Sequence, residues 1–274
     1  MSTEERYLRH LGLFGEEGQR RIEVTSAAIV GLGGLGSHVA QQLAYLGVRH
    51  FALFDGDAVE TSNLNRLIGA TGADVGAPKV VVAERSIGAI QPGAGIAVEQ
   101  RHFDGDAHAD SLAQVDVLFG CVDEDIARLG LLRIASEFAT PYVDLASDVA
   151  PGGEFGGRIV FAKDGERCLS CIGELDQHAL ARSQMTAEQR AADDTIYGVD
   201  RHMLGGAGPS VVSVNGVVAS IAVTEFLAWR TGLREPRGYL TYRGDLATVG
   251  ARADPPREYC HYCMTLWGSR GATS

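Results

Sequence analysis

A glycine-rich turn between a short apolar strand and a helical segment is the feature that most restricts how this chain can fold. Residues 27–30 are apolar and predict a buried strand, and residues 37–46 predict a helix. The intervening segment, GLGGLG, carries Gly31, Gly33 and Gly36 at the G-x-G-x-x-G spacing. Glycines at this spacing permit a tight turn, close approach of the backbone to a phosphate, and close packing of helix on strand. The sequence therefore predicts a nucleotide-binding strand–turn–helix unit.

The residues that follow the turn favour a triphosphate over a nicotinamide dinucleotide. A second predicted strand, 50–54, ends at Asp55, where a carboxylate can accept hydrogen bonds from ribose hydroxyls. Further along, Arg66 can offer a bidentate fork to phosphate oxygens, and Lys79 can offer a point charge at the start of a helix. Such cations stabilise the charge that develops when a bond between two phosphates is cleaved. The candidate phosphate-binding group consists of Asn63, Asn65, Arg66 and Lys79.

Two alternatives stay open for these residues. Taken one at a time, Arg66 and Lys79 can be solvated surface charges, which is the usual state of such side chains. The glycine turn and Asp55 by themselves also fit an NAD-dependent oxidoreductase. An oxidoreductase gives no account of the two cations, however, so ATP is the preferred nucleotide.

A group of acidic residues follows another predicted strand, 116–121. Because ligands sit at the carboxyl ends of parallel strands, Asp123, Glu124 and Asp125 are expected near the phosphates. Carboxylates in this position can hold Mg²⁺ with few protein ligands and several waters, and Asp123 is the candidate ligand. In the alternative interpretation, Asp123 or Asp125 caps the helix predicted over 125–138.

Four of the five cysteines form two Cys-x-x-Cys pairs: Cys168 with Cys171, and Cys260 with Cys263. Two such pairs can close a tetrahedral thiolate site to which each pair supplies two ligands. We therefore expect a structural zinc site that joins two distant segments. Disulfide bonds are the alternative, which a cytoplasmic protein disfavours. The fifth cysteine, Cys121, is expected to be a buried strand residue.

Alternating strand and helix patterns predict a doubly wound, Rossmann-like α/β fold with a mostly parallel sheet. Strands are predicted over 27–30, 50–54, 96–100, 116–121 and 141–145, and helices near 37–46, 79–90, 106–113, 125–138 and 212–230. The segments 156–161 and 239–243 predict an added antiparallel portion. We expect a single domain over 1–274, with a helical arm (1–25), a nucleotide-binding half (26–150) and the remaining strands within 151–274. Residues 173–208 lack a sustained apolar face and predict a lid, a binding loop or a disordered segment.

The charge and hydropathy of the chain exclude several classes of partner. The net charge of −11 is spread along the sequence, which argues against nucleic acid or an anionic membrane as a partner. No apolar run in the sequence approaches the roughly 20 residues that span a bilayer. The polar N-terminal residues do not form a signal peptide. The protein is therefore expected to be cytoplasmic.

Together these motifs resemble the ThiF/MoeB/HesA group of ubiquitin-activating-like adenylyltransferases, which adenylate the C-terminal glycine of small carrier proteins. The resemblance covers nearly the whole chain. It rests on residues 6–10 (RYLRH), the glycine turn, Asp55, residues 62–66 (SNLNR), residues 76–79 (GAPK), residues 121–123 (CVD) and the two Cys-x-x-Cys pairs.

The resemblance implies a role for each matching residue. The glycine turn, Gly34 included, would face ATP, and Asp55 would bind its ribose. Asn63, Arg66 and Lys79 would engage the phosphates, and Asp123 would bind Mg²⁺. Arg9 matches an arginine that enters the site of the partner subunit, which implies a homodimer. Residues 173–208 match the crossover loop under which the carrier's tail passes, and the four paired cysteines would hold structural zinc.

The chain departs from the family pattern in three places. Glu124 stands where the family usually has Asn, which adds negative charge beside the expected metal. Residues 142–145 (YVDL), together with Ser147 and Asp148, are less apolar than expected and put the details of the substrate in doubt. Residues 173–208 contain no cysteine, as in the members that stop at the acyl adenylate and unlike those that form a thioester.

The sequence therefore predicts an ATP-dependent adenylyltransferase that converts a carboxylate and ATP into an acyl adenylate and pyrophosphate. The expected carboxylate is the C-terminal Gly-Gly of a ubiquitin-like or sulfur-carrier protein. A peptide or small acid of a biosynthetic pathway is the alternative within the same enzyme class. Outside that class, the oxidoreductase and a catalytically silent nucleotide-binding scaffold remain.

Overall fold

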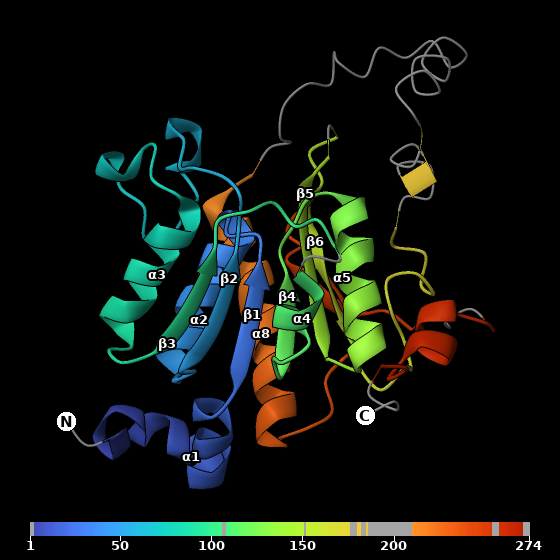
Figure 1. The fold of residues 1–274 in the computed structure, drawn as a ribbon, viewed down its shortest axis with the longest axis horizontal. Coiled ribbons are helices and arrows are strands. Elements are labelled where there is room, and N and C mark those ends of the chain that lie inside the picture. Colours follow the sequence, from blue (N-terminus) through green and yellow to red (C-terminus); the bar gives the residue numbers. More distant parts are fainter. Residues whose placement is uncertain are drawn as a thin grey trace.

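A mixed eight-stranded sheet forms the centre of the molecule, with helices on both faces (Figure 1). The computed structural model describes residues 3–105, 108–150, 152–175, 180–181, 185, 210–253 and 258–270. The strand order is β3-β2-β1-β4-β5-β6-β7-β8; the first five are parallel, and β6 to β8 add antiparallel pairings. The bounds are β1 Ser26–Val30, β2 His50–Phe54, β3 Gly95–Glu99, β4 Val117–Gly120, β5 Tyr142–Val149, β6 Phe155–Ala162, β7 Tyr239–Arg243 and β8 Thr248–Ala251. The predicted fold class is confirmed.

The helices agree with the sequence pattern in their placement and differ mainly at their ends. They are α1 Thr3–Glu23, α2 Gly34–Leu46, α3 Lys79–Ile90, α4 Ala109–Leu112, α5 Asp125–Phe138 and α8 Val212–Thr231, with the short turns η1 Thr61–Asn63, η2 Gly72–Asp74 and η5 Tyr262–Leu266. Helix α2 begins inside the glycine turn, earlier than predicted. Helix α4 is shorter than the predicted 106–113, of which 106–107 lie outside the described residues. Most of the predicted loop 173–208 also lies outside them.

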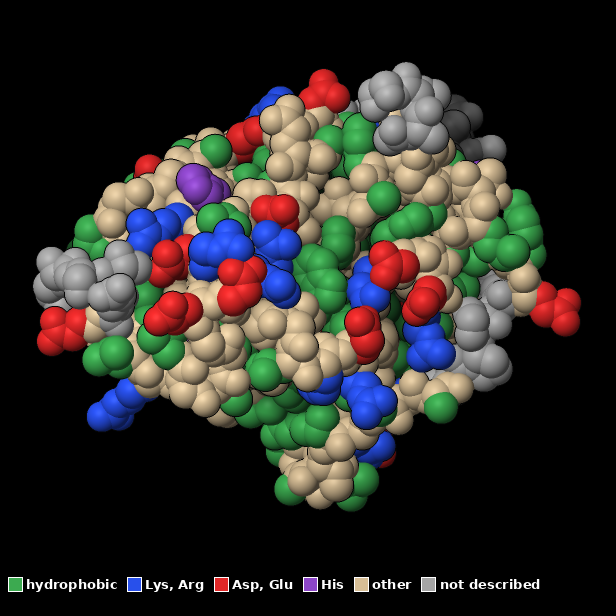
Figure 2. All heavy atoms as spheres, turned by 90° about the horizontal axis from the view of Figure 1, so that it is seen from below, with side chains coloured by type: hydrophobic (Ala, Val, Ile, Leu, Met, Phe, Trp, Pro, Cys, Tyr) green, Lys and Arg blue, Asp and Glu red, His purple; other side chains and the backbone are tan. Residues whose placement is uncertain are grey.

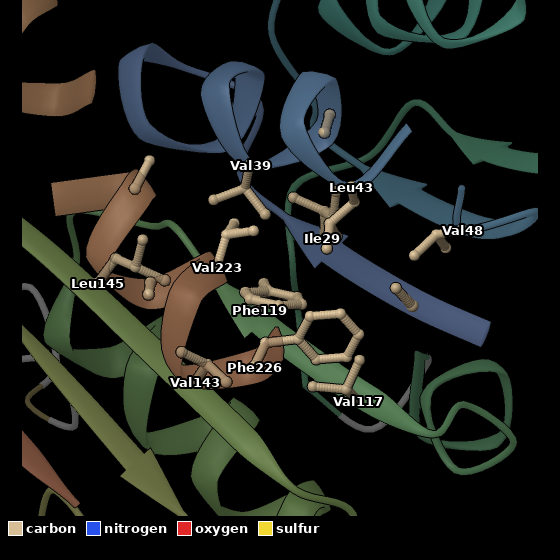
Figure 3. Packing of buried hydrophobic residues seen from close by; sticks show 14 of the residues in the cluster. Ile29, Val39, Leu43, Val48, Val117, Phe119, Val143, Leu145, Val223 and Phe226 are labelled. Atoms are coloured by element: carbon tan, nitrogen blue, oxygen red, sulfur yellow. The ribbon is translucent and has the colours of Figure 1, made fainter. Parts of the chain in front are cut away.

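Side chains of the central strands alternate between two apolar cores, as the two-residue period of a strand requires. Ile29 and Phe119 belong to the core under α2 and α8, whereas Leu118 belongs to the core under α5. Figure 3 shows the first of these cores, in which the Phe119 ring meets the Phe226 ring of α8 edge-on, with centroids 5.8 Å apart. Both faces of the sheet are thus covered, which fixes the strands whose ends carry the functional residues.

Helix α8 contradicts the prediction from the sequence that no segment is long and apolar enough to span a membrane. By length and composition alone it could cross a membrane, and it is the one such helix among the residues described above. Half of its most apolar window is buried, however, and Val218, Ala222 and Phe226 lie in the core beneath α2. A buried core helix passes the same test as a membrane span, so the apolar composition of α8 is explained by its packing.

Charges of both signs are intermixed on the face seen from below in Figure 2, which lies on the side of α1. Lys and Arg side chains there lie beside Asp and Glu side chains. Ion pairs of this kind join Arg20 and Arg21 to Glu17 on α1. On this face, positive charge is therefore not gathered into an extended basic surface of the kind that nucleic acids select.

Candidate active site

The glycine turn is held onto the end of β2 by the carboxylate of Asp55. The Leu32 N–H donates to Asp55 Oδ2 at 2.6 Å, and the Asp57 N–H donates to Asp55 Oδ1 at 2.8 Å. The Gly31 N–H donates to the carbonyl of Phe54 at 2.8 Å, and Gly31 has φ = 86°, which favours glycine. Asp55 is buried, and each of its oxygens keeps further acceptor capacity for a ligand.

The absence of a side chain matters for different reasons at the three motif glycines. A Cβ on Gly36 would lie 1.8 Å from the Gly31 carbonyl oxygen, and a Cβ on Gly31 would lie 2.6 Å from the Cys121 carbonyl oxygen. A Cβ on Gly33 would meet no protein atom within 4 Å. Packing therefore requires glycine at 31 and 36. The open space over Gly33 fits the close approach of a phosphate to the backbone.

A cleft of about 400 Å³ brings most of the predicted site residues together. It lies at the carboxyl ends of β1, β2 and β4 and along the second half of β5, where ligands of doubly wound sheets sit. Its lining includes Gly31, Gly33, Gly34, Asp55, Arg66, Lys79 and Asp123. The expectation that two cations and one acid converge beside the glycine turn thus agrees with the geometry.

The two cations predicted for the cleft, Arg66 and Lys79, already have partners. The Lys79 ammonium, with a side chain only 11% exposed, lies 2.6 Å from Asp57 Oδ2. Arg66 Nη1 donates to the Ser62 carbonyl at 2.7 Å and to Asn65 Oδ1 at 3.0 Å. Asp57, which the sequence reasoning missed, stands two residues after Asp55 and so at the end of the same strand. Its position just after a predicted strand was the sequence signal that could have identified it as a residue of the site.

Asn63 and Asn65 organise the loop that carries Arg66. The Asn63 Oδ1 accepts the Glu60 N–H at 3.2 Å, which closes η1, and Asn65 accepts from Arg66. Neither asparagine is among the residues that line the cleft. Their contact with phosphate stays a prediction, and the structure gives them a role in holding Arg66.

Arg9 lies apart from the other predicted site residues. It is exposed on α1, which lies at the opposite end of the molecule from the loops that follow β2 (Figure 1). Arg9 does not line the cleft of its own chain. Its entry into the site of a partner subunit stays a prediction.

The acids after β4 divide between the cleft and the helix. Asp123 is exposed and lines the cleft. The N-cap of α5 is Glu124, not Asp123 or Asp125 as the capping alternative supposed, and its side chain makes no capping hydrogen bond. Cys121 lies one residue beyond β4 and is half-buried. Desolvation and the nearby Asp144 raise the pKa of the Cys121 thiol well above its ordinary value, so this residue stays protonated.

A buried ion cluster centred on Asp144 lies behind the acids. Asp144, with no exposed surface, accepts from Arg128 Nη1 at 2.7 Å, from Arg158 Nη1 at 2.5 Å and from the Tyr142 hydroxyl at 2.9 Å. Burial, together with Asp144, raises the Tyr142 pKa well above its ordinary value. Arg128 Nη2 also donates to the Val122 carbonyl at 2.5 Å, which fixes the backbone immediately before Asp123.

The four paired cysteines come together between two distant segments. Their Sγ atoms all lie within 4.8 Å of one another, and all four residues are buried. Cys168 Sγ and Cys260 Sγ are 3.5 Å apart. Thiolates bound to one zinc ion at the usual length of about 2.3 Å would stand about 3.8 Å from each other. The cluster therefore has the donor set and the spacing of a tetrahedral zinc site, and the free thiols set aside the disulfide alternative.

The model of the ThiF family matches residues 6–260, which is nearly the whole chain. The chain belongs to the ThiF family. It is 29% identical to the sulfur carrier protein ThiS adenylyltransferase of Escherichia coli K12 over 225 residues, or 82% of this chain and 79% of that protein. It is 35% identical to the molybdopterin-synthase adenylyltransferase of the same organism over 172 residues, or 62% of this chain and 68% of that protein.

Solved structures support the same fold for this ThiF-family chain. The microcin C7 biosynthetic enzyme MccB in complex with N-formylated MccA superimposes with a TM-score of 0.77 and 18% identity, covering 95% of this chain and 75% of that one. Escherichia coli MccB with ATP gives a TM-score of 0.74 and 19% identity, covering 94% and 74%. The ThiF-family chain is an ATP-dependent adenylyltransferase, as its relatives' names state for them. The oxidoreductase alternative is therefore not retained.

The different roles of the glycines can be separated by two matched substitutions. Gly36→Ala should lower the free energy of unfolding by about 3 kcal/mol, because its Cβ would force the turn backbone apart. Gly33→Ala should change stability by less than about 0.5 kcal/mol, because its Cβ meets no protein atom, yet weaken ATP binding. Urea unfolding and calorimetric titration with ATP would measure both effects. A Gly33→Ala variant with unchanged ATP affinity would contradict this assignment.

Removal of Asp144, the central acid of the ion cluster, should lower the stability of the fold. Asp144→Ala leaves two buried arginines without their shared carboxylate and should destabilise the fold by about 3–5 kcal/mol. The control is Glu17→Ala, which breaks the exposed pairs with Arg20 and Arg21 and should change stability far less. Urea unfolding of both variants makes the comparison, and equal losses would show that the cluster contributes nothing special.

Proposed function

We propose that this protein activates the C-terminal glycine of a small sulfur-carrier or ubiquitin-like protein as an acyl adenylate, with release of pyrophosphate. The observation that carries the proposal is the convergence of Arg66, Lys79 and Asp123 with the glycine turn in one cleft. A dinucleotide oxidoreductase has no need of this charge arrangement, whereas cleavage between two phosphates does.

The chemistry follows from the charges of the cleft. The substrate carboxylate is already ionised at neutral pH, so its oxygen can attack the α-phosphorus without a general base. Arg66 and Lys79 would neutralise charge on the phosphates, for which Lys79 must exchange Asp57 for phosphate oxygens. Asp123 would hold Mg²⁺, which when bound supplies further positive charge to the phosphate oxygens. Positioning and electrostatics then account for the rate without covalent participation of a protein thiol.

The choice of a carrier protein over a small acid rests on the relatives. The ThiS adenylyltransferase is similar over most of both chains, whereas the MccB likeness, at under one-fifth identity, speaks for the fold alone. A peptide substrate, such as the MccA bound to MccB, remains the second candidate. The absence of cysteine from 173–208 favours release of the adenylate to an external acceptor.

Further parts of the proposal concern organisation. We infer a cytoplasmic homodimer in which Arg9 of each subunit completes the partner's cleft, and a crossover loop over 173–208 that covers the carrier's tail. The 274 residues would act as one adenylation domain. The Cys168, Cys171, Cys260 and Cys263 cluster would hold structural zinc.

Asp123→Ala should lower carboxylate-dependent ATP–pyrophosphate exchange by about 100-fold or more, because the phosphates lose their metal ligand. The circular dichroism spectrum and the melting temperature should stay unchanged, since Asp123 is exposed. Asp110→Ala, at an exposed acid of α4 outside the cleft lining, is the control and should exchange normally. Near-normal exchange by the Asp123 variant would remove this residue from the mechanism.

Cys263→Ser should release the zinc ion and lower the melting temperature, because structural metal binding is coupled to folding. Cys121→Ala, which lies outside the cluster, should retain one zinc ion per chain. Elemental analysis of both purified variants gives the metal content. Wild-type protein without bound zinc, or a Cys263 variant that keeps it, would argue against a four-cysteine site.

A further inference from the structure

A short chain of hydrogen bonds joins residues of β5 and α8 at the cleft. The Ser147 hydroxyl on β5 donates to Asn215 Oδ1 at 2.8 Å, and Asn215 Nδ2 donates to Ser210 Oγ at 3.0 Å. All three residues line the cleft. No role in the reaction has been given to any of them above.

The direction of this chain leaves a free donor at its end. Ser210 Oγ accepts from Asn215, so the hydroxyl hydrogen of Ser210 points elsewhere, and no described residue accepts it. Asn215 is 1% exposed, and its Nδ2 carries a second hydrogen that bonds to none of the described residues. Two hydrogen-bond donors therefore stand at the cleft without acceptors among the described residues.

These donors lie next to the expected phosphates. A Cβ placed on Gly34 would stand 2.2 Å from Asn215 Nδ2 and 3.4 Å from Arg66 Cδ. The amide thus lies against the glycine turn, beside the arginine expected to bind phosphate. Helix α8 begins at Val212, two residues after Ser210, with no side-chain cap on its first turn, and this end of the helix adds positive potential.

A negative charge on β5, Asp148, lines the same cleft. It is exposed, and its Oδ1 accepts the N–H of Val149 at 2.8 Å. Because solvent screens an exposed charge, the repulsion between Asp148 and an approaching anion is weakened.

We propose that Ser210 and Asn215 bind the carboxylate that attacks ATP. This assignment deepens the proposed function and rests on it. One carboxylate oxygen accepts from the Ser210 hydroxyl and the Asn215 amide. The other forms the bond to the α-phosphorus while the bond to the pyrophosphate oxygen breaks, and the electron pair leaves with pyrophosphate. No proton is transferred. The oxygen held by Ser210 becomes the carbonyl oxygen of the acyl adenylate and is still an acceptor.

The assignment can be tested by binding, without knowledge of the natural carrier. The probes are adenosine 5′-monophosphate and the glycylglycyl sulfamate of adenosine, a stable analogue of the acyl adenylate that adds the acyl carbonyl. Wild-type protein should bind the sulfamate more tightly. The surplus affinity is the ratio of the affinity for the sulfamate to the affinity for the monophosphate. Ser210→Ala should lower this ratio about 10-fold, because a hydrogen bond to an acyl oxygen is lost. Affinity for the monophosphate should be unchanged.

Asn215→Asp gives a sharper test because it keeps the shape of the side chain and reverses the hydrogen bond. An aspartate at 215 cannot donate and instead accepts the Ser210 hydrogen, so both free donors disappear. The surplus affinity for the sulfamate should fall about 100-fold. The fold of this variant is checked by its circular dichroism spectrum and melting temperature.

Two serines provide controls. Ser213→Ala, on the same helix but lining a separate cavity, should leave both affinities unchanged. Ser147→Ala removes the far end of the chain and should cost less than Ser210→Ala.

Three outcomes would overturn the assignment. They are a wild-type protein that binds both probes equally, variants that lose both affinities in parallel, and a Ser147 variant that loses more than the Ser210 variant. Failure to bind either probe would instead remove the proposed function itself.

Discussion

The hydrogen bond from the Leu32 N–H to the buried carboxylate of Asp55 is the contact on which the site depends. It joins the turn after β1 to the end of β2, so the first two strands present one continuous surface. A carboxylate taken out of water is costly unless its oxygens are paired, and here both accept backbone N–H groups. Asp55 therefore shapes the turn before any ligand is present, which distinguishes its structural task from the ribose contact implied by its family.

A second set of contacts links the cysteine cluster to the loop that carries Asp123. Glu174, three residues after Cys171, pairs with Arg158 at 2.8 Å, and Arg158 pairs with the buried Asp144. Arg128 completes the path by holding both Asp144 and the carbonyl before Asp123. Four charges of alternating sign thus run from one end of the molecule's second core to the cleft. Metal binding by the cysteines would then stabilise the same segment that positions one end of this path.

Local patterns in the sequence predicted the fold well where the period was strong. The glycine turn, the alternation of strands and helices, and the bounds of α3 and α5 depend on neighbouring residues, and these agree with the structure. Strand β8 was missed because all four of its residues are exposed at the sheet edge, where no apolar period forms. Helix α8 was placed correctly, but the sequence-based expectation missed that it is long and apolar enough to pass the test for a membrane span.

The candidate site was predicted in part for the same reason. Residues at strand ends, such as Asp55 and Asp123, are revealed by position, since the carboxyl ends of parallel strands meet. The partners of Asp144 and Asn215 cannot be recognised from their positions in the sequence, because these contacts join segments separated by up to 68 residues in the chain. Ser147 was noted as a departure from the family pattern, but only the folded chain shows that it faces α8.

The pairing of Lys79 with Asp57 has a consequence for how spent nucleotide leaves. A triphosphate offers oxygens that can compete with the aspartate for the ammonium group, whereas a nucleotide stripped of its terminal phosphates offers few. Once pyrophosphate has departed, Lys79 can pair with Asp57 again, and the enzyme loses one of its contacts with the remaining nucleotide. The ion pair between Lys79 and Asp57 would thereby favour binding of a triphosphate over a nucleotide that lacks the terminal phosphates. The difference arises because phosphate oxygens must replace the Asp57 carboxylate as the partner of Lys79.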